Sequence, residues 1–308
     1  MKPFILAIIL SLPATLYAQT DTTYWNKGGK FGANVSQATL TNWSAGGSNT
    51  IAGAVYFNYI FDYKKRDILW QNTIDMGIGW IKEARSAQKK ADDRMVLTSS
   101  FGKKLTSSND HWYYNATADF RTQFAKGYNV EDDPNQNRPI SKFISPGYLM
   151  TSIGIDYRPN DYFNVAISPI TGKFTFVQDD SLSTAGAFGV DPGEKFRAEL
   201  GMSLKASFNK EIVSNVLYTT NLLLFSDYLE HPDKIDVNWE NILTLKVNGW
   251  LSANIYNQII YDYDIKFYEL DPLTGENDLT TETDKWQFKN IIGLGLAVQF
   301  GGKRGEKK

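Results

Sequence analysis

The chain has 308 residues, a formal net charge of −2 and no cysteine. This charge balance argues against a nucleic-acid partner, because such a surface must neutralise many phosphates. The lack of cysteine excludes disulfides, thiol nucleophiles and Cys-ligated metal sites. The only two histidines, His111 and His231, disfavour most zinc enzymes and His-based triads. Aromatic residues make up 14% of the chain and glycine is frequent, as in an all-β protein.

The first 18 residues resemble an export signal. Lys2 gives a positive start, residues 4–16 form an apolar segment, and residues 15–18 before Gln19 resemble a cleavage site. Such a segment is a secretory signal peptide and is too short for a transmembrane helix. We therefore expect a signal peptide over residues 1–18 and a short N-terminal segment over residues 19–28.

The rest of the chain alternates with period two. In residues 196–208, apolar residues at the even positions alternate with Arg, Glu, Gly, Ser, Lys and Ser, which is the pattern of a strand with one apolar face. The same pattern predicts twelve strands. They span residues 29–40, 49–63, 67–81, 93–105, 111–125, 143–158, 162–177, 194–209, 213–228, 235–248, 250–265 and 285–300. Pro169 and Gly172 are expected to bend or interrupt the seventh strand.

The connections alternate in length. Short polar turns are predicted at residues 64–66, 107–110, 159–161, 209–211 and 248–249, and longer loops at residues 83–92, 126–142, 178–193 and 267–284. Short turns at one end and long loops at the other are typical of up-and-down antiparallel transmembrane β-barrels. The predicted fold is all-β: a barrel of about 12 strands over residues 29–300, with both termini periplasmic.

Long strands with aromatic ends favour a barrel whose apolar face meets lipid. We expect the protein in the outer membrane of a Gram-negative cell, with outer-membrane lipid as its surroundings. An exported soluble β-sandwich is the alternative. The aromatic residues predicted to lie at the membrane interfaces are Trp70, Trp80, Trp112, Tyr157, Tyr162, Trp239, Trp250 and Tyr263.

The polar strand faces would then line the lumen. The charged candidates are Asp75, Asp119, Arg121, Arg197, Glu199, Lys205, Glu240, Lys246 and Lys289. Two interpretations stay open: these groups line a hydrated pore, or they pair across the lumen and plug it. The apolar segment 186–190 either folds into the barrel as a constriction or covers its rim.

The sequence predicts no cofactor and no metal, and no enzyme. Acidic loop residues such as Glu131, Asp132 and Asp133 do not have the spacing of an EF-hand, so calcium binding is the weaker interpretation. The chain has no G-x-S-x-G motif. His231 near Asp233 or Asp236 resembles an omptin-like acid/His site, but that grouping is common in proteins.

Six segments carry a resemblance to a known family. They are residues 43–49 (WSAGGSN), 124–128 (FAKGY), 159–163 (PNDYF), 168–173 (SPITGK), 186–190 (GAFGV) and 235–240 (IDVNWE). Across residues 25–300 the chain resembles a family of exported Bacteroidetes proteins of the DUF3078 type, known only as a domain of unknown function. The resemblance implies an outer-membrane barrel and carries over no functional residue.

The resemblance also implies the barrel-assembly machinery as a partner, because such barrels commonly end on an aromatic residue. Phe300 would be that residue, although a basic tail, residues 301–308, follows it. The predicted function is a passive pore for small polar solutes. A closed barrel with a structural or partner-docking role is the alternative, and a hydrolase at the barrel rim is a lesser one. The sequence leaves any oligomeric partner open.

Overall fold

A computed structural model describes residues 24–38, 49–84, 86–106, 109–129, 133, 135–270 and 277–302. The expected signal peptide, the tail from residue 303 and most of segment 43–49 lie outside these described residues. No helix in the described part of the chain is long and apolar enough to span a membrane.

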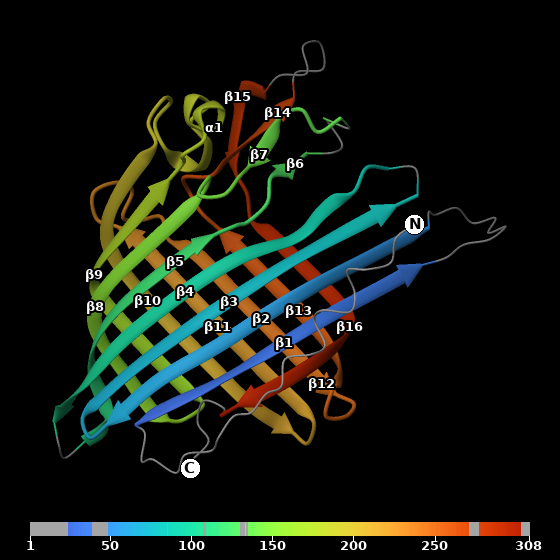
Figure 1. Cartoon of the computed structure of the whole chain (residues 1–308). Coiled ribbons are helices and arrows are strands. Elements are labelled where there is room, and N and C mark those ends of the chain that lie inside the picture. Colours follow the sequence, from blue (N-terminus) through green and yellow to red (C-terminus); the bar gives the residue numbers. More distant parts are fainter. Residues whose placement is uncertain are drawn as a thin grey trace.

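The described residues form a closed antiparallel barrel of twelve strands (Figure 1). Around the barrel the order is β1-β16-β13-β12-β11-β10-β9-β8-β5-β4-β3-β2, and β2 pairs with β1 to close the ring. The bounds are β1 Trp25–Ala38, β2 Thr50–Lys65, β3 Ile68–Glu83, β4 Lys89–Thr106, β5 Asn109–Thr122, β8 Gly147–Asn160, β9 Phe163–Phe176, β10 Phe196–Val213, β11 Val216–Asp227, β12 Asp236–Lys246, β13 Leu251–Tyr261 and β16 Gln287–Gly301. The predicted antiparallel all-β barrel and its strand number are confirmed.

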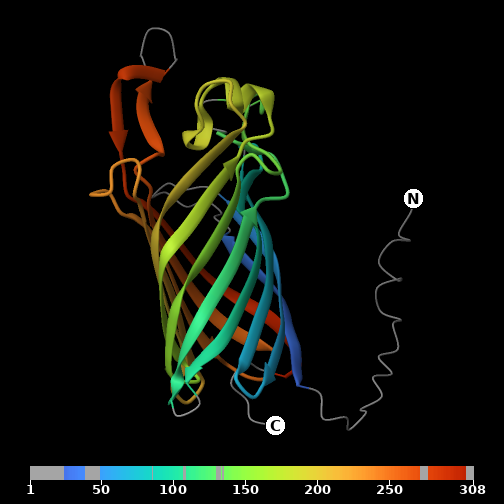
Figure 2. The same ribbon diagram turned by 90° about the vertical axis from the view of Figure 1, so that its left-hand side faces the viewer.

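The long connections carry the remaining elements, and these gather at one end of the barrel (Figures 1 and 2). They are β6 (Gly127–Tyr128) with β7 (Pro139–Ser141), helix α1 (Asp180–Thr184) with a 3₁₀ turn (Ala187–Gly189), and β14 (Lys266–Leu270) with β15 (Asn277–Asp284). β1 begins and β16 ends at the opposite end, among the short turns (Figure 1). We call the two ends the loop end and the turn end.

Several strand boundaries differ from the prediction, among them three that change a predicted segment, loop or turn. β1 begins at Trp25, inside the expected N-terminal segment, because Trp25 pairs with Tyr63 of β2. β4 begins at Lys89, so that much of the expected loop 83–92 is strand. The turn predicted at residues 209–211 is wrong, since β10 runs on to Val213. The chain reverses instead around Asn215, whose φ is 65° and whose backbone N–H donates to Glu211; Asn tolerates this left-handed conformation.

The seventh predicted strand, β9, is bent rather than broken. Its pairing with β8 shifts register between Ile153 and Ile155, and its pairing with β10 shifts between Gly201 and Ser203. Both shifts face the stretch containing Pro169, which cannot donate to a sheet ladder. A β-bulge absorbs the proline and keeps the later inward residues of β9 facing the lumen.

The outer face of the barrel is apolar and the inner face is polar. Ile153, Ile170 and Leu294 are 60%, 59% and 62% exposed, whereas Asp119, Asp156 and Ser203 are 6%, 1% and 1% exposed. Alternation along each strand separates the two sets, because successive side chains point to opposite faces. This is the inverse of a water-soluble sandwich, whose buried face is apolar.

The aromatic residues singled out in the sequence lie near both ends of the strands. Trp70, Trp112, Tyr157, Tyr162 and Trp250 are near the turn end, and Trp80 and Trp239 lie towards the loop end. Tyr263 is placed differently. The chain leaves the barrel wall at Tyr261, and the Tyr263 ring contacts that of His231, with 4.9 Å between ring centres.

Candidate functional site

The lumen holds most of the charged candidates, and their arrangement differs between its walls. On β3, β4 and β5 the charges form pairs along one surface. Arg94 Nε lies 2.7 Å from Asp75 Oδ1, and Arg94 Nη1 lies 2.5 Å from Asp92 Oδ2. Arg121 Nε lies 2.7 Å from Asp119 Oδ1, and Thr98 Oγ1 donates to the other oxygen of Asp119 at 2.7 Å. We call Asp75, Asp92, Arg94, Asp119 and Arg121 the charged wall.

The facing strands β11, β12 and β13 carry mainly apolar and neutral polar groups on the inside, together with the carboxylates of Asp236 and Glu240. Their inward residues Leu223, Phe225, Glu240, Tyr256 and Ile260 line the same cavity, and we call them the mixed wall. The carboxylate of Glu240 accepts from Tyr256 Oη at 3.5 Å and from Gln258 Nε2 at 3.3 Å. Within the described part of the chain, Glu240 forms no ion pair.

A first set of contacts crosses the lumen towards the loop end. Lys173 of β9 places its Nζ 2.7 Å from Asp236 of β12 and 3.4 Å from Asp262, which follows β13. It also lies 3.3 Å from Glu199 on the neighbouring strand β10. Removing one partner from such a buried network is costly, because the remaining charge loses its compensation. We call this set the upper bridge.

A second set crosses at the level of Glu240, four residues further along β12 towards the turn end. The Tyr256 ring centre on β13 lies 5.9 Å from the Arg94 guanidinium carbon on β4 and 5.7 Å from Lys289 Nζ on β16. Lys289 Nζ in turn lies 2.6 Å from Asp92 Oδ1. Four strands, β16, β1, β2 and β3, separate β13 from β4 around the ring. These contacts, which we call the lower bridge, therefore connect opposite walls.

Both bridges border one cavity of about 540 Å³. This volume is within the range of about 300–1,000 Å³ that small-molecule sites occupy. Six of its lining residues are acidic: Asp92, Asp93, Asp119, Asp236, Glu240 and Asp262. Four are basic: Arg94, Arg121, Lys173 and Lys289. The lining thus has a formal excess of negative charge, together with the apolar residues of the mixed wall.

The connection between β9 and β10 covers the loop end of the cavity. Val177, Leu182 and Val190 form a small buried core within it, and Phe188 packs against this core and lines the cavity. Arg197 of β10 holds it from the mixed-wall side by donating to the Gly189 carbonyl at 2.9 Å. We call residues 177–195 the cap. Of the predicted segment 186–190, Phe188 reaches the cavity.

Asp179 holds the cap from the other side. Its carboxylate accepts from the backbone N–H groups of Ser181 and Leu182, each at 3.2 Å, as the N-cap of α1. It also pairs with Lys142, in the loop that leads into β8. The Lys142 ammonium, together with the Ser181 hydroxyl, lowers the pKa of Asp179 to about 2.

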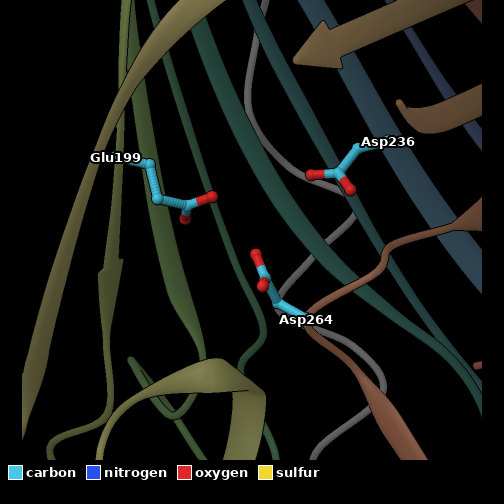
Figure 3. Close-up of side chains that lie close together, drawn as sticks. All are labelled: Glu199, Asp236 and Asp264. Atoms are coloured by element: carbon cyan, nitrogen blue, oxygen red, sulfur yellow. The ribbon is translucent and has the colours of Figure 1, made fainter. Parts of the chain in front are cut away.

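Three carboxylates converge where the cap meets the barrel. Oxygens of Glu199, Asp236 and Asp264 lie within 4.8 Å of one another, and the three side chains point towards a common space (Figure 3). Lys173 binds the first two, and Arg197 Nη2 lies 3.0 Å from Asp264. Because two cations already bind these carboxylates, the arrangement is a salt-bridge network joining β9, β10, β12 and the end of β13.

The remaining sequence candidates lie elsewhere. Lys246 pairs with Glu211 at 2.7 Å at the turn end, where both side chains are exposed. Lys205 lies in the lumen within electrostatic reach of Asp119. His231 is in the β11–β12 loop, and the two acids considered beside it pair with other groups: Asp233 with Lys234 at 4.0 Å, and Asp236 with Lys173.

Five residues of the bridges were not among the sequence candidates: Asp92, Arg94, Lys173, Tyr256 and Asp262. Arg94, Lys173 and Tyr256 fall inside predicted strands at polar-face positions, so the alternation itself was a signal for them. Asp92 was assigned to a loop, since nothing in the local sequence shows that β4 starts at Lys89. Which of these side chains meet across the lumen follows only from barrel closure.

No curated protein matches the chain. Solved structures do share its general architecture. An outer membrane channel from Pseudomonas putida F1 is 8% identical, with 90% of this chain and 95% of that chain covered and a TM-score of 0.39. The NanC porin is 8% identical, with 90% of this chain and 99% of that chain covered and a TM-score of 0.37. The translocator domain of the autotransporter NalP from Neisseria meningitidis is 8% identical, with 91% of this chain and 90% of that chain covered and a TM-score of 0.32. Likeness at this level assigns no function to the chain.

The sequence family gives the more specific match. The model of a family described as "Protein of unknown function (DUF3078)" matches residues 35–128, which include β2 to β5 and thus the charged wall. The resemblance predicted from the sequence is therefore confirmed over these residues, and this part of the chain is similar to the DUF3078 proteins.

Proposed function

We propose that the protein is an outer-membrane β-barrel through which small polar solutes pass passively. The observation that carries this proposal is the inverted barrel: an apolar outer face around a charged lumen with a cavity of about 540 Å³. In lipid every backbone polar group must be paired within the protein, and a closed barrel meets this requirement. Exposed side chains such as Ile153 and Leu294 would then contact lipid acyl chains.

The placement in the membrane follows the usual orientation of such barrels. The turn end, where β1 begins and β16 ends, would face the periplasm, and the cap would face the outside, since outer-membrane barrels have short periplasmic turns and longer extracellular loops. We expect the barrel-assembly machinery to recognise the aromatic Phe300, which is 42% exposed on the last strand. Insertion of the purified protein into lipid vesicles, followed by a heat-dependent shift on a gel, tests the membrane placement. Complete recovery of the native protein from cells without detergent would exclude it.

Single-channel conductance in a planar bilayer tests the pore itself. The protein is purified in detergent, and its folding is first shown by the heat-dependent gel shift. Steady and repeatable current steps are the expected result. Folded protein that never conducts would contradict the pore.

The two bridges favour a second candidate function, a closed barrel with a structural or docking role. Lys173 reaches Asp236 at 2.7 Å, and Tyr256 lies 5.9 Å from Arg94 across the lumen. Charges in membrane proteins commonly pair in this way without forming a path. The conductance experiment separates the two functions, because a closed barrel folds but gives no current.

A further inference from the structure

Most inward positions of the barrel are polar or charged, but part of the lumen is apolar. Leu223 on β11 is in register with Asn238 on β12, which is in register with Ile260 on β13. Phe225 is the next inward residue on β11, and Phe188 reaches the cavity from the cap. We call Leu223, Phe225, Ile260 and Phe188 the luminal apolar patch, because all four line the same cavity.

An apolar patch is unexpected in a lumen that holds only water and ions. The interior of an aqueous barrel is polar, and apolar surface kept in water is unfavourable in proportion to its area. Phe188 moreover has a φ of 61°, which is uncommon for a residue other than glycine, and such conformations often persist at binding sites. The patch is therefore consistent with a solute that brings its own apolar group.

The charges around the patch favour a cationic solute. On the charged wall, Arg94 and Arg121 are each bound to carboxylates at 2.7 Å or less. Glu240 is the next inward residue after Asn238 on β12, and its carboxylate accepts from the neutral groups of Tyr256 and Gln258. Arg121 is within electrostatic reach of Glu240, but no cation of the described residues forms an ion pair with it, so a bound cation would meet a carboxylate without an ion-pair partner.

We infer that the cavity binds small amphiphilic cations, with the apolar group on the luminal apolar patch and the cationic group beside Glu240. This inference rests on the proposed function, since it names the solute class of the same lumen. The cavity volume of about 540 Å³ accommodates an organic ammonium ion with one aromatic ring.

Equilibrium dialysis tests the inference without requiring conductance. The folded protein in lipid nanodiscs is dialysed against benzyltrimethylammonium, tetramethylammonium or benzenesulfonate, and binding to empty nanodiscs is subtracted. We expect benzyltrimethylammonium to bind about tenfold more tightly than tetramethylammonium, from partial burial of its phenyl ring. Benzenesulfonate, with the same ring and the opposite charge, should bind least.

Matched variants locate the site. Leu223→Ser should remove the advantage of the benzyl group, whereas Leu217→Ser should retain it. Leu217 is an inward leucine of the same strand, in register with the buried Thr244 near the turn end, and does not line the cavity. Glu240→Gln should weaken the binding of both ammonium ions by a similar factor. The protein should still bind benzyltrimethylammonium more tightly than tetramethylammonium.

Each outcome decides a separate point. Equal binding of the two ammonium ions to the unmodified protein overturns the inference, whether or not the barrel conducts. Equal binding of benzenesulfonate overturns its cationic part. Binding in a barrel that does not conduct supports the site while the pore proposal fails.

A second variant covers the case in which Leu223→Ser does not fold. The chain has no cysteine, so Ile260→Cys introduces a single thiol within the patch. Benzyltrimethylammonium should slow modification of this thiol by a water-soluble reagent severalfold, and tetramethylammonium should not. Equal rates with and without benzyltrimethylammonium would overturn the placement on the patch.

Discussion

The two facing walls of the lumen use their inward positions in opposite ways. On the charged wall each arginine has a carboxylate partner on the same wall, as in the pairs of Arg94 with Asp75 and of Arg121 with Asp119. On the mixed wall apolar side chains such as Leu223 adjoin Glu240, which has neutral donors as partners. Opposite charges this close cancel at longer range. The wall with more charges is thus the one expected to contribute less to solute selection.

The most disruptive change is to break the compensation on the charged wall. Asp119→Ala removes the ion-pair partner of Arg121. It also removes the negative charge that interacts with Lys205. We expect a loss of about 2 kcal/mol in unfolding free energy, because the half-buried Arg121 loses its charged hydrogen-bond partner. We also expect the reversal potential in a salt gradient to move towards anion preference. Urea unfolding in lipid vesicles and bilayer recordings measure the two effects.

Glu240→Gln is the matched change on the mixed wall. It removes one carboxylate charge as Asp119→Ala does, but Gln can still accept from Tyr256 and Gln258. We expect a loss of less than about 1 kcal/mol in unfolding free energy, since no ion pair is broken. Equal losses for the two variants would contradict the difference between the walls.

The next change removes the contact that joins the walls. In Tyr256→Ala the lower bridge loses the ring that lies between Arg94 and Lys289. We expect single-channel conductance to rise severalfold, because the side chain that crosses the lumen is gone. Tyr256→Phe should conduct like the unmodified protein, since it keeps the ring and loses only the hydroxyl.

Tyr56→Ala is the control for this change. Tyr56 also faces inward, but its ring lies over Gly32 and near Lys30 of the adjacent strand, on its own wall. Its removal should leave conductance unchanged. A similar conductance rise in Tyr56→Ala and Tyr256→Ala would show that the lower bridge does not limit passage.

The contrast between the walls also shows how far the sequence could predict this molecule. Period-two alternation and the two classes of connection are local, so they were enough for the twelve strands and the closed barrel. They also identified Asp119, Arg121 and Glu240 as inward residues. The turn at Asn215 was missed because β10 is four residues longer than the polar residues at 209–211 suggest.

What the sequence could not show is which residues meet across the lumen. Lys289 of β16 and Asp92 of β4 are 197 residues apart and lie on strands that do not pair, yet their side chains lie 2.6 Å apart. Such pairs depend on the strand tilt and the stagger at which the barrel closes, and no local pattern encodes these. The luminal apolar patch was hidden for a related reason. Leu223 falls within the run Leu222, Leu223 and Leu224, where alternation gives no indication of which leucine faces inward.

The cap is held from both sides, and the mixed-wall side is expected to matter more. Arg197 contacts the Gly189 carbonyl, Asp264 and Glu230 at 2.9, 3.0 and 3.1 Å. Arg197→Gln should lower the local stability of the cap by about 1–2 kcal/mol, because these hydrogen bonds are lost. The looser cap should make the current through open channels noisier. The variance of the open-channel current measures this. Unchanged variance would mean that Phe188 stays in place without Arg197.

The smallest effect is expected on the other side of the cap, at Asp179. Its pKa is lowered to about 2, whereas an aspartate in an unfolded chain titrates near 3.9. A depressed carboxyl pKa stabilises the folded form above the unfolded value, and this contribution is lost as the pH falls through the folded value. Amide hydrogen exchange at Ser181 and Leu182, corrected for its intrinsic pH dependence, should therefore show protection that is full at pH 5 and declines as the pH approaches about 2.

Asp179→Ala should lose about 1 kcal/mol of local stability, because the N-cap of α1 is removed. The protection of its amides should not vary between those pH values. The same pH dependence in Asp179→Ala would assign the titration to another group of the cap and leave Lys142 without a role in holding it.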